Sequence, residues 1–487
     1  MLYCRRMPGL ESDVLPLSPD PAAAPARPYF HPWATWLSTV LVALLVGYVF
    51  ALTPSDPLDH LRWPEDSLER LAGRDMEMRA AMARAPRWER QLYAFLSGGE
   101  ESVDDWVRWH EELAQVSSSP DVELDRLILL GEVGRTAAVR EGVEEWEPDN
   151  EAATRRREWV TAAYLEPSLS RATGRALITE VRDELPGGWF ADALAARLAL
   201  RSGSAVAREQ GESAILGRGA AILDRWRRLQ AVGVLLAVAG LASVAMMLLT
   251  HADPQIAHGR TLSDLSLGDG YALFIRGALG FLALGMGLGL IIPDESALDG
   301  IAGPATIAPI LLCSFLYFRA KGQSFIEAFG LAPARGRWAT IAWVAVALIG
   351  LQLTGETVIG AALDALHLSS HWADGLQENL IWGSWGLVVR ETVDSAIWAP
   401  LGEEVAFRGV LYAALRSRFG VMPAAGLSAA VFAVAHGYGV LGFVAVFWSG
   451  ALWALSYEKT GSLWPGIIAH CAGNLMATAG VIALLRL

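Results

Sequence analysis

Residues 401–409 read LGEEVAFRG and place three ionisable side chains inside an apolar run over about 392–415. A charge at bilayer depth costs at least about 2.5–3.5 kcal/mol on an insertion scale, so each needs a partner or a function. Helical geometry places Glu404 and Arg408 one turn apart on the same face, and Arg408 can therefore neutralise Glu404. Glu403 points about 100° away and has no partner nearby in the sequence. An unpaired carboxyl in a low-dielectric surrounding can act as a general base or acid near neutral pH.

Two further apolar runs supply matching polar side chains. His436 ends the run 421–436, and His470 and Asn474 lie four residues apart on one face of the run 463–485. Because each of these groups would otherwise face lipid, we expect them to meet Glu403 and Glu404 in one inward cavity. The alternative is a structural ion pair between Glu404 and Arg408, with each histidine bonded to a backbone carbonyl.

The composition indicates a membrane protein with a soluble portion. The chain has 487 residues, of which 53% are hydrophobic, and a mean hydropathy of +0.33. Charges concentrate in 53–228, whereas nearly uncharged runs of about 20 residues, the length that crosses a bilayer core, follow residue 229. The region 53–228 carries a net charge of −9 out of −13, so nucleic acid is excluded as a partner because phosphate contacts need a basic surface.

We predict an all-α fold: a polytopic helix bundle of about eight to nine transmembrane helices with an inserted soluble helical domain. The predicted parts are an N-terminal tail (1–32), a transmembrane anchor (33–52), a soluble helical domain (53–228) and a membrane domain (229–487). The predicted spans of the membrane domain are 229–250, 271–292, 302–318, 337–356, 392–415, 421–436, 440–457 and 463–485. A cleaved signal peptide is disfavoured for the first run because it is long and lies far from the start. Prolines punctuate the soluble domain, which predicts several helices of ordinary length. Nothing in it has the spacing of a catalytic motif, so we expect a scaffold or partner-binding role.

The motifs of the last third resemble those of a known family. GEEVAFRG at 402–409, the FxxxH of Phe432 and His436 and the HxxxN of His470 and Asn474 are similar to the motifs of the CAAX-protease and bacteriocin-processing (CPBP, or Abi) intramembrane proteases. The phrase YEKTGSLWP at 457–465 is also similar to that family. The resemblance covers about 390–480 and leaves the soluble domain unexplained. Three ordered motifs on consecutive helices are a specific signal, whereas a lone ExxxR would be weak.

The resemblance implies peptide-bond hydrolysis within the membrane. In that scheme Glu403 and His436 activate a water, His470 and Asn474 stabilise the oxyanion, and Glu404 belongs to the catalytic set with Arg408 orienting it. A carboxylate and an imidazole can take a proton from water, and N–H donors can hold the developing negative charge. The implied partners are a peptide or protein substrate in or at the membrane, and the lipid bilayer.

A metal cofactor is left open by the sequence. Glu403, His436 and His470 are an adequate zinc ligand set with a position free for water, as a metalloprotease would need, yet a glutamate-driven mechanism without metal is equally compatible. HExxH is absent, and three scattered cysteines (Cys4, Cys313 and Cys471) form no CxxC pair. Two lysines beside 37 arginines suggest a high-GC bacterial gene, which predicts a multi-pass protein of the bacterial inner membrane.

Two other classes of function use the same polar groups. A transporter or channel could carry protons through buried glutamates and histidines, but it should show a second, matching half, and 229–356 contains no counterpart of Glu403 or His470. A non-catalytic membrane scaffold would tolerate Glu403→Gln without loss of function. The substrate, the side of the membrane to which the site opens and the oligomeric state stay open.

Overall fold

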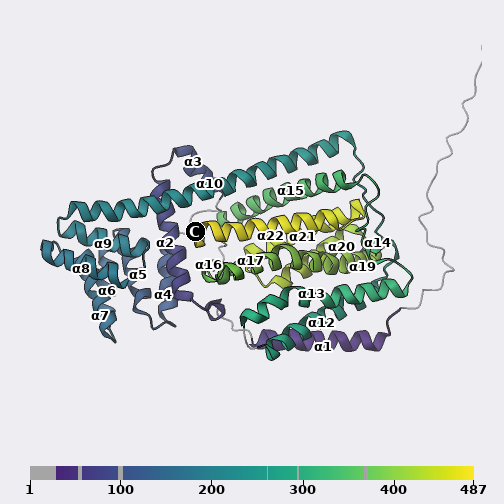
Figure 1. The fold of residues 1–487 in the computed structure, drawn as a ribbon, viewed down its shortest axis with the longest axis horizontal. Helices are drawn as coiled ribbons and strands as arrows, with labels where there is room; N and C mark the ends of the chain where they lie inside the picture. The colour runs from purple at the N-terminus through teal and green to yellow at the C-terminus, as the bar shows by residue number, and fades with distance from the viewer. Residues whose placement is uncertain are drawn as a thin grey trace, which may run out of the picture.

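The computed structural model describes residues 29–52, 57–96, 103–259, 261–292, 295–366, 368 and 371–487. It is 82% helical, with no strand in the described ranges, which confirms the predicted all-α class. Figure 1 shows two parts: a group of short helices at one end and a bundle of long helices beside it. Most of the predicted tail 1–32 lies outside the described residues.

Short helices make up the part predicted to be soluble. They are η1 (Pro57–His60), α2 (Pro64–Met82), α3 (Arg87–Leu96), α4 (Val103–Ala114), α5 (Pro120–Glu132), α6 (Thr136–Glu145), α7 (Glu151–Val160), η2 (Thr161–Leu165), α8 (Arg171–Glu184) and α9 (Trp189–Arg201). Pro64 and Pro120 occupy the first helical position of α2 and α5, where a missing N–H costs nothing. Pro86, Pro148 and Pro186 precede α3, α7 and α9. The prolines thus separate the helices as the sequence predicts.

A large apolar core holds most of these short helices together, and a smaller cluster packs α3 and the end of α2 against α10. The fully buried side chains of the large core include Leu68 of α2, Leu127 of α5, Trp159 of α7 and Leu194 of α9. Burying a large apolar side chain contributes about 1.5–3 kcal/mol. This region therefore has a core of its own, separate from that of the membrane helices.

The long helix α10 (Ala205–Thr250) joins the two parts. Its first half packs on α2 and α9, and its second half packs on α15 (Trp338–Ala365) among the membrane helices. The boundary predicted at 228 falls inside this helix, which continues without a break. Gly240 and Gly350 lie at the α10–α15 crossing, where a Cβ on Gly240 would come within 2.4 Å of the Cα of Gly350. Small residues at such crossings let membrane helices approach closely.

Seven helices of the described chain are long and apolar enough to cross a membrane. Besides α10 and α15 they are α1 (Pro32–Leu52), α12 (Leu267–Ile291), α13 (Glu295–Ala320), α21 (Val440–Thr460) and α22 (Trp464–Val481) with its extension η5 (Ile482–Arg486). The predicted span 421–436 corresponds to the shorter helix α20 (Val421–His436). The predicted span 392–415 lies within a charged helical rod over 385–419 that is divided into several segments. The polytopic bundle is confirmed. In Figure 1, α1 lies beside α12, across the bundle from α10 and α15.

Shorter helices complete the chain at the ends of the bundle: α11 (Thr261–Asp264), α14 (Phe325–Ala328) and α16 (Glu378–Trp382). Glu378 of α16 fastens the soluble helices to the bundle. Its carboxylate accepts hydrogen bonds from the backbone N–H groups of Arg62 and Trp63, at 2.7 and 3.1 Å, and from the Ser67 hydroxyl at 2.7 Å. The segment leading into α2 is thus held by a side chain more than 300 residues away.

Candidate active site

The helical rod 385–419 carries the glutamates and is interrupted twice by wider turns. It consists of α17 (Trp385–Val393), the π-helical turn η3 (Asp394–Trp398), α18 (Ala399–Glu403), the π-helical segment η4 (Glu404–Tyr412) and α19 (Ala413–Phe419). The second π-helical segment begins at Glu404, so the change from α-helical to π-helical winding falls between Glu403 and Glu404. Wide turns of this kind occur frequently at functional sites because they re-aim side chains.

Two glycines let this rod pack tightly against its neighbours. A Cβ on Gly402 would lie 2.5 Å from the Ile307 side chain, and one on Gly409 would lie 2.6 Å from the Phe329 ring. The glycines that frame the sequence GEEVAFRG therefore fix the position of the rod, and with it the direction of the glutamates.

Glu404 and Arg408 form the ion pair that their spacing predicts. Arg408 Nη1 donates to Glu404 Oε1 at 2.8 Å, and the two side chains are 0% and 1% exposed. The guanidinium lies over the rings of Phe432 and Trp453, with Cζ at 4.1 and 4.8 Å from the ring centroids. Aromatic faces attract a cation, and the attraction is greater when the cation is desolvated. Arg408 is therefore held by one carboxylate and two rings.

His470 of α22 connects the two glutamates. Its Nδ1 lies 3.3 Å from Glu404 Oε1 and its Nε2 lies 3.6 Å from Glu403 Oε2. The ring stacks on Trp453 with centroids 4.2 Å apart and an interplanar angle of 22°. A carboxylate on one ring nitrogen and an aromatic face along the ring leave the imidazole little freedom to rotate.

Glu403 differs from its neighbour in access and in bonding. Its side chain is 29% exposed, whereas that of Glu404 is 1% exposed. Within the described part of the chain, Oε2 of each glutamate is buried and has no hydrogen-bond partner. The difference in access therefore comes from the rest of the Glu403 side chain, which is the more exposed of the two.

The structure places His436 and Asn474 at the margin of this cluster. His436 Nδ1 lies 2.8 Å from the carbonyl oxygen of Phe432, and the Phe432 ring is adjacent to both histidines, with centroids 4.5 Å from His436 and 5.9 Å from His470. Asn474 Nδ2 donates to the carbonyl oxygen of Ser395 at 2.7 Å, which joins α22 to η3. The backbone-bonded alternative for a histidine thus holds for one nitrogen of His436, while its Nε2 stays available.

Trp453 is a contact residue that sequence reasoning missed. It is buried, stacks on His470 and lies under Arg408. The chain has 19 tryptophans, and nothing in the local sequence distinguishes this one. Gln352 of α15 packs against α22 beside Asn474, since its Nε2 would lie 2.5 Å from a Cβ on Gly473, and it donates to Glu356 at 3.1 Å.

The predicted zinc ligands do not form a metal-binding group as they stand. In the described ranges no three His, Cys, Asp or Glu side chains are arranged to hold an ion. Glu403 and His470 approach each other, but His436 makes its recorded contacts with Phe432 and Tyr438. One nitrogen of His470 is also taken by Glu404.

Comparison with known proteins shows that the region containing this cluster is similar to a known family. Residues 384–476 match the family described as type II CAAX prenyl endopeptidase, Rce1-like. No curated protein and no solved structure matches the chain. The match covers the rod with Glu403 and Glu404 and the helices with His436, His470 and Asn474. The chain is a multi-pass membrane protein whose residues 384–476 are similar to that family, and the predicted resemblance to the CPBP intramembrane proteases is confirmed.

Proposed function

We propose that the protein is an intramembrane endopeptidase in which Glu403 is the general base. The observation that carries the proposal is the contrast between two adjacent glutamates. Glu404 is buried and its Oε1 contacts both Arg408 and His470, whereas the Glu403 side chain is partly exposed and its one printed contact is the longer one of 3.6 Å from Oε2 to His470 Nε2. A general base must lie within hydrogen-bond reach of the proton it abstracts, and Glu403 meets this condition for a water entering the site.

The proposed reaction consumes one water, and the proton that Glu403 accepts is passed on to the product. Glu403 takes a proton as the water oxygen bonds to the scissile carbonyl carbon, which leaves a negative charge on the carbonyl oxygen. Glu403 then gives the proton to the amide nitrogen as the carbon–nitrogen bond breaks, yielding an acid and an amine. His436 has its Nδ1 against a carbonyl, so its Nε2 serves as a second acceptor that orients the water.

His470 and Asn474 are proposed to stabilise the oxyanion. In its doubly protonated form, with Nδ1–H directed to Glu404, His470 can donate its Nε2–H to the developing charge. Asn474 uses one N–H on Ser395 and retains a second. In this scheme Arg408 holds Glu404 in place beside the imidazole.

No step of this proposal passes through a metal. Zinc at Glu403, His436 and His470 would require these three side chains to move together. The zinc prediction therefore has to be tested by experiment. The proposed substrate is a peptide or protein segment in or at the bilayer. The family description names prenylated CAAX substrates, whereas a bacterial setting favours peptide maturation, bacteriocin self-immunity or protein sorting.

Cleavage of a fluorogenic peptide panel by the detergent-purified chain tests the proposal. Glu403→Gln keeps the size of the side chain and removes the base, so kcat should fall about 10²–10⁴-fold. Glu327→Gln on the exposed helix α14 is the matched control and should cleave like wild type. Equal cleavage by Glu403→Gln and Glu327→Gln would refute the role of Glu403 as general base. A parallel series with a chelator decides the zinc question, because only a metal-dependent activity is lost.

A further inference from the structure

A second cluster of carboxylates surrounds a cavity of about 130 Å³ in the soluble helices. The cavity lies between α2, α4, α5 and the start of α9. Its acidic lining residues come from two helices that are distant in the sequence: Glu65, Asp66 and Glu69 of α2, and Asp121 and Asp125 of α5. Asp66 and Pro186 at its rim are exposed, whereas Asp125 is buried. The cavity therefore opens to solvent and narrows toward an acidic floor.

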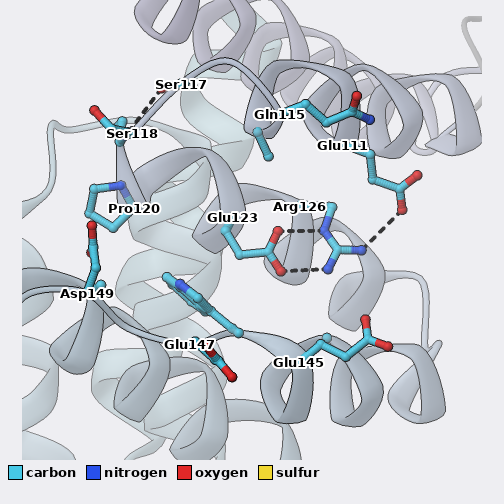
Figure 2. Close-up of a pocket in the computed structure, with 15 residues that line it drawn as sticks. Glu111, Gln115, Ser117, Ser118, Pro120, Glu123, Arg126, Glu145, Glu147 and Asp149 are labelled. Atoms are coloured by element: carbon cyan, nitrogen blue, oxygen red, sulfur yellow. Dashed lines mark hydrogen bonds and ion pairs between the residues drawn. The ribbon is translucent and has the colours of Figure 1, made fainter.

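A neighbouring hollow on the other side of α5 measures about 630 Å³ and holds an arginine among its carboxylates. Figure 2 shows Arg126 between Glu123 and Glu111. Its guanidinium donates to Glu123 at 2.6 and 2.8 Å and to Glu111 at 3.2 Å. Arg126 thus supplies a counter-charge to two of the carboxylates of this hollow.

The inner cavity lacks such a counter-charge, since its lining in the described chain includes no arginine or lysine. Glu65 accepts a hydrogen bond from Ser117, and Asp121 pairs with Arg156 at 2.9 Å from outside the cavity. Asp66, Glu69 and Asp125 remain as carboxyl groups facing the same space.

His110 provides an independent sign that a ligand belongs in this cavity. The side chain lines the cavity, is 1% exposed and places its Nδ1 at 2.7 Å from the carbonyl oxygen of Trp106. Its Nε2 is buried and has no partner in the part of the chain that is described. Burial lowers the pKa of His110 to about 4, so the ring is neutral at pH 7. A neutral ring that donates through Nδ1 presents Nε2 as an acceptor.

The size and lining of the cavity define the ligand. Its volume exceeds that of a bare metal ion and equals about four waters at ~30 Å³ each. The polar lining consists of carboxyl groups, the His110 imidazole and the Ser119 hydroxyl, and Leu113, Val122 and Phe190 form apolar walls. A guanidinium or primary ammonium offers several N–H donors to carboxylates, and its alkyl stem can lie on apolar side chains.

We propose that this cavity binds the cationic head of an amine or guanidine ligand, with Asp66, Glu69 and Asp125 accepting its N–H groups and His110 Nε2 accepting one more. A lysine or arginine side chain of a peptide and a free small amine share this chemistry. The site is separate from the protease site and does not depend on its activity.

The ionisation of Glu69 makes the binding sensitive to pH. Burial raises the pKa of Glu69 to about 7, with Asp66 and Asp121 adding to the rise and Arg70 opposing it. Asp125 also has a raised pKa, because of burial and then of Glu69 and Asp121. A cation favours the ionised carboxylates, so binding should release protons and tighten as the pH rises from 6 to 8.

Titration calorimetry on the detergent-purified full chain tests the proposal with methylguanidine, butylamine and N-acetyl-argininamide as probes. At pH 8 and low salt the expected result is saturable binding that weakens at least about tenfold in Glu69→Gln and in Asp125→Asn, which corresponds to about 1.4 kcal/mol. Glu147→Gln in the outer hollow is the matched control and should bind like wild type. Tighter binding of the argininamide identifies a peptide side chain as the source, and tighter binding of butylamine identifies a free amine.

Three results would overturn the proposal: no saturable binding of any probe to the wild type, equal binding by the variants and the wild type, or equal binding of tetramethylammonium, which has no N–H to donate. The melting temperature of each variant separates lost binding from lost folding. Removing a buried carboxylate should leave this temperature unchanged or raise it. Binding in Glu403→Gln should equal that of the wild type, so the outcome is independent of the protease assay.

Discussion

The membrane helices and the soluble helices each enclose carboxylates beside a histidine, and they neutralise them differently. In the membrane cluster, Arg408 pairs with Glu404 and lies against two aromatic rings. In the soluble cavity, no arginine or lysine belongs to the described lining, and Glu69 and Asp125 have raised pKa values. Charges within a bilayer must carry their counter-charge with them. In a cavity that opens to water, the carboxyl groups can instead be neutralised by protonation or by a bound cationic ligand.

This difference separates a preorganised site from a receptive one. Glu404, Arg408, His470 and Trp453 restrain one another through an ion pair, a hydrogen-bond contact and ring stacking. Fixed charges of this kind suit catalysis because they need no rearrangement during the reaction. The soluble cavity has acceptors with unused capacity, which suits binding.

The largest expected effect comes from removing Arg408, the counter-charge of the membrane cluster. This change tests most directly whether the membrane cluster and the soluble cavity neutralise their carboxylates differently. Arg408→Met leaves Glu404 buried with only the longer contact to His470, and removing one partner of a buried ion pair typically costs about 3–5 kcal/mol. We expect the free energy of unfolding in detergent to fall by that amount. The double variant Glu404→Gln/Arg408→Met should recover most of the loss, because it removes the stranded charge as well.

Arg418→Met, at an exposed position of the same rod, is the control for this measurement. If Arg408→Met and Arg418→Met unfold alike, the ion pair does not stabilise the membrane cluster. The contrast with the soluble cavity would then lose its physical basis.

Asn474→Ala sharpens the comparison by asking whether the membrane cluster acts on a reacting group. If Asn474 stabilises the oxyanion, its loss should lower kcat about 10²–10³-fold with little change in KM. Ser395→Ala is the matched control, since it keeps the backbone carbonyl that Asn474 contacts. A lower melting temperature with unchanged kcat would instead assign Asn474 to the packing of α22 against η3.

The sequence could predict contacts within one helix better than contacts between helices. The Glu404–Arg408 pair follows from a spacing of four, and the prolines of the soluble domain mark helix starts. Trp453 could not be predicted, because its stacking on His470 depends on how α21 and α22 cross. Asn474 is directed to Ser395 by a π-helical turn for which the sequence carries no signal.

The soluble cavity was equally hidden from sequence reasoning. Its carboxylates belong to α2 and α5, more than 50 residues apart, and acidic side chains on a helix usually face water. Only the packing of α2 against α4 and α5 turns Glu69 and Asp125 toward the same space as His110. A charge-rich composition therefore predicted a soluble domain without predicting a site within it.

The smallest expected effect concerns the pH dependence of stability of the soluble helices. The pKa of Glu69 is raised from 4.5 to about 7 by burial, so the folded chain binds this proton more tightly than the unfolded chain. The stability from this group is fully present below about pH 4.5 and is lost as the pH rises through about 7. His110 acts in the opposite sense: burial lowers its pKa from 6.5 to about 4, so its contribution is lost as the pH falls through that range.

Glu69→Gln should therefore flatten the alkaline side of the stability profile and leave the acidic side, set by His110, unchanged. We expect its melting temperature to exceed that of the wild type by roughly 2–5 °C at pH 8 and to match it near pH 5. Glu147→Gln, on the outer hollow, should follow the wild type throughout. Parallel profiles for Glu69→Gln and wild type would mean that Glu69 is already neutralised in the folded chain. The soluble cavity would then resemble the membrane cluster, and the distinction between a receptive and a preorganised site would fail.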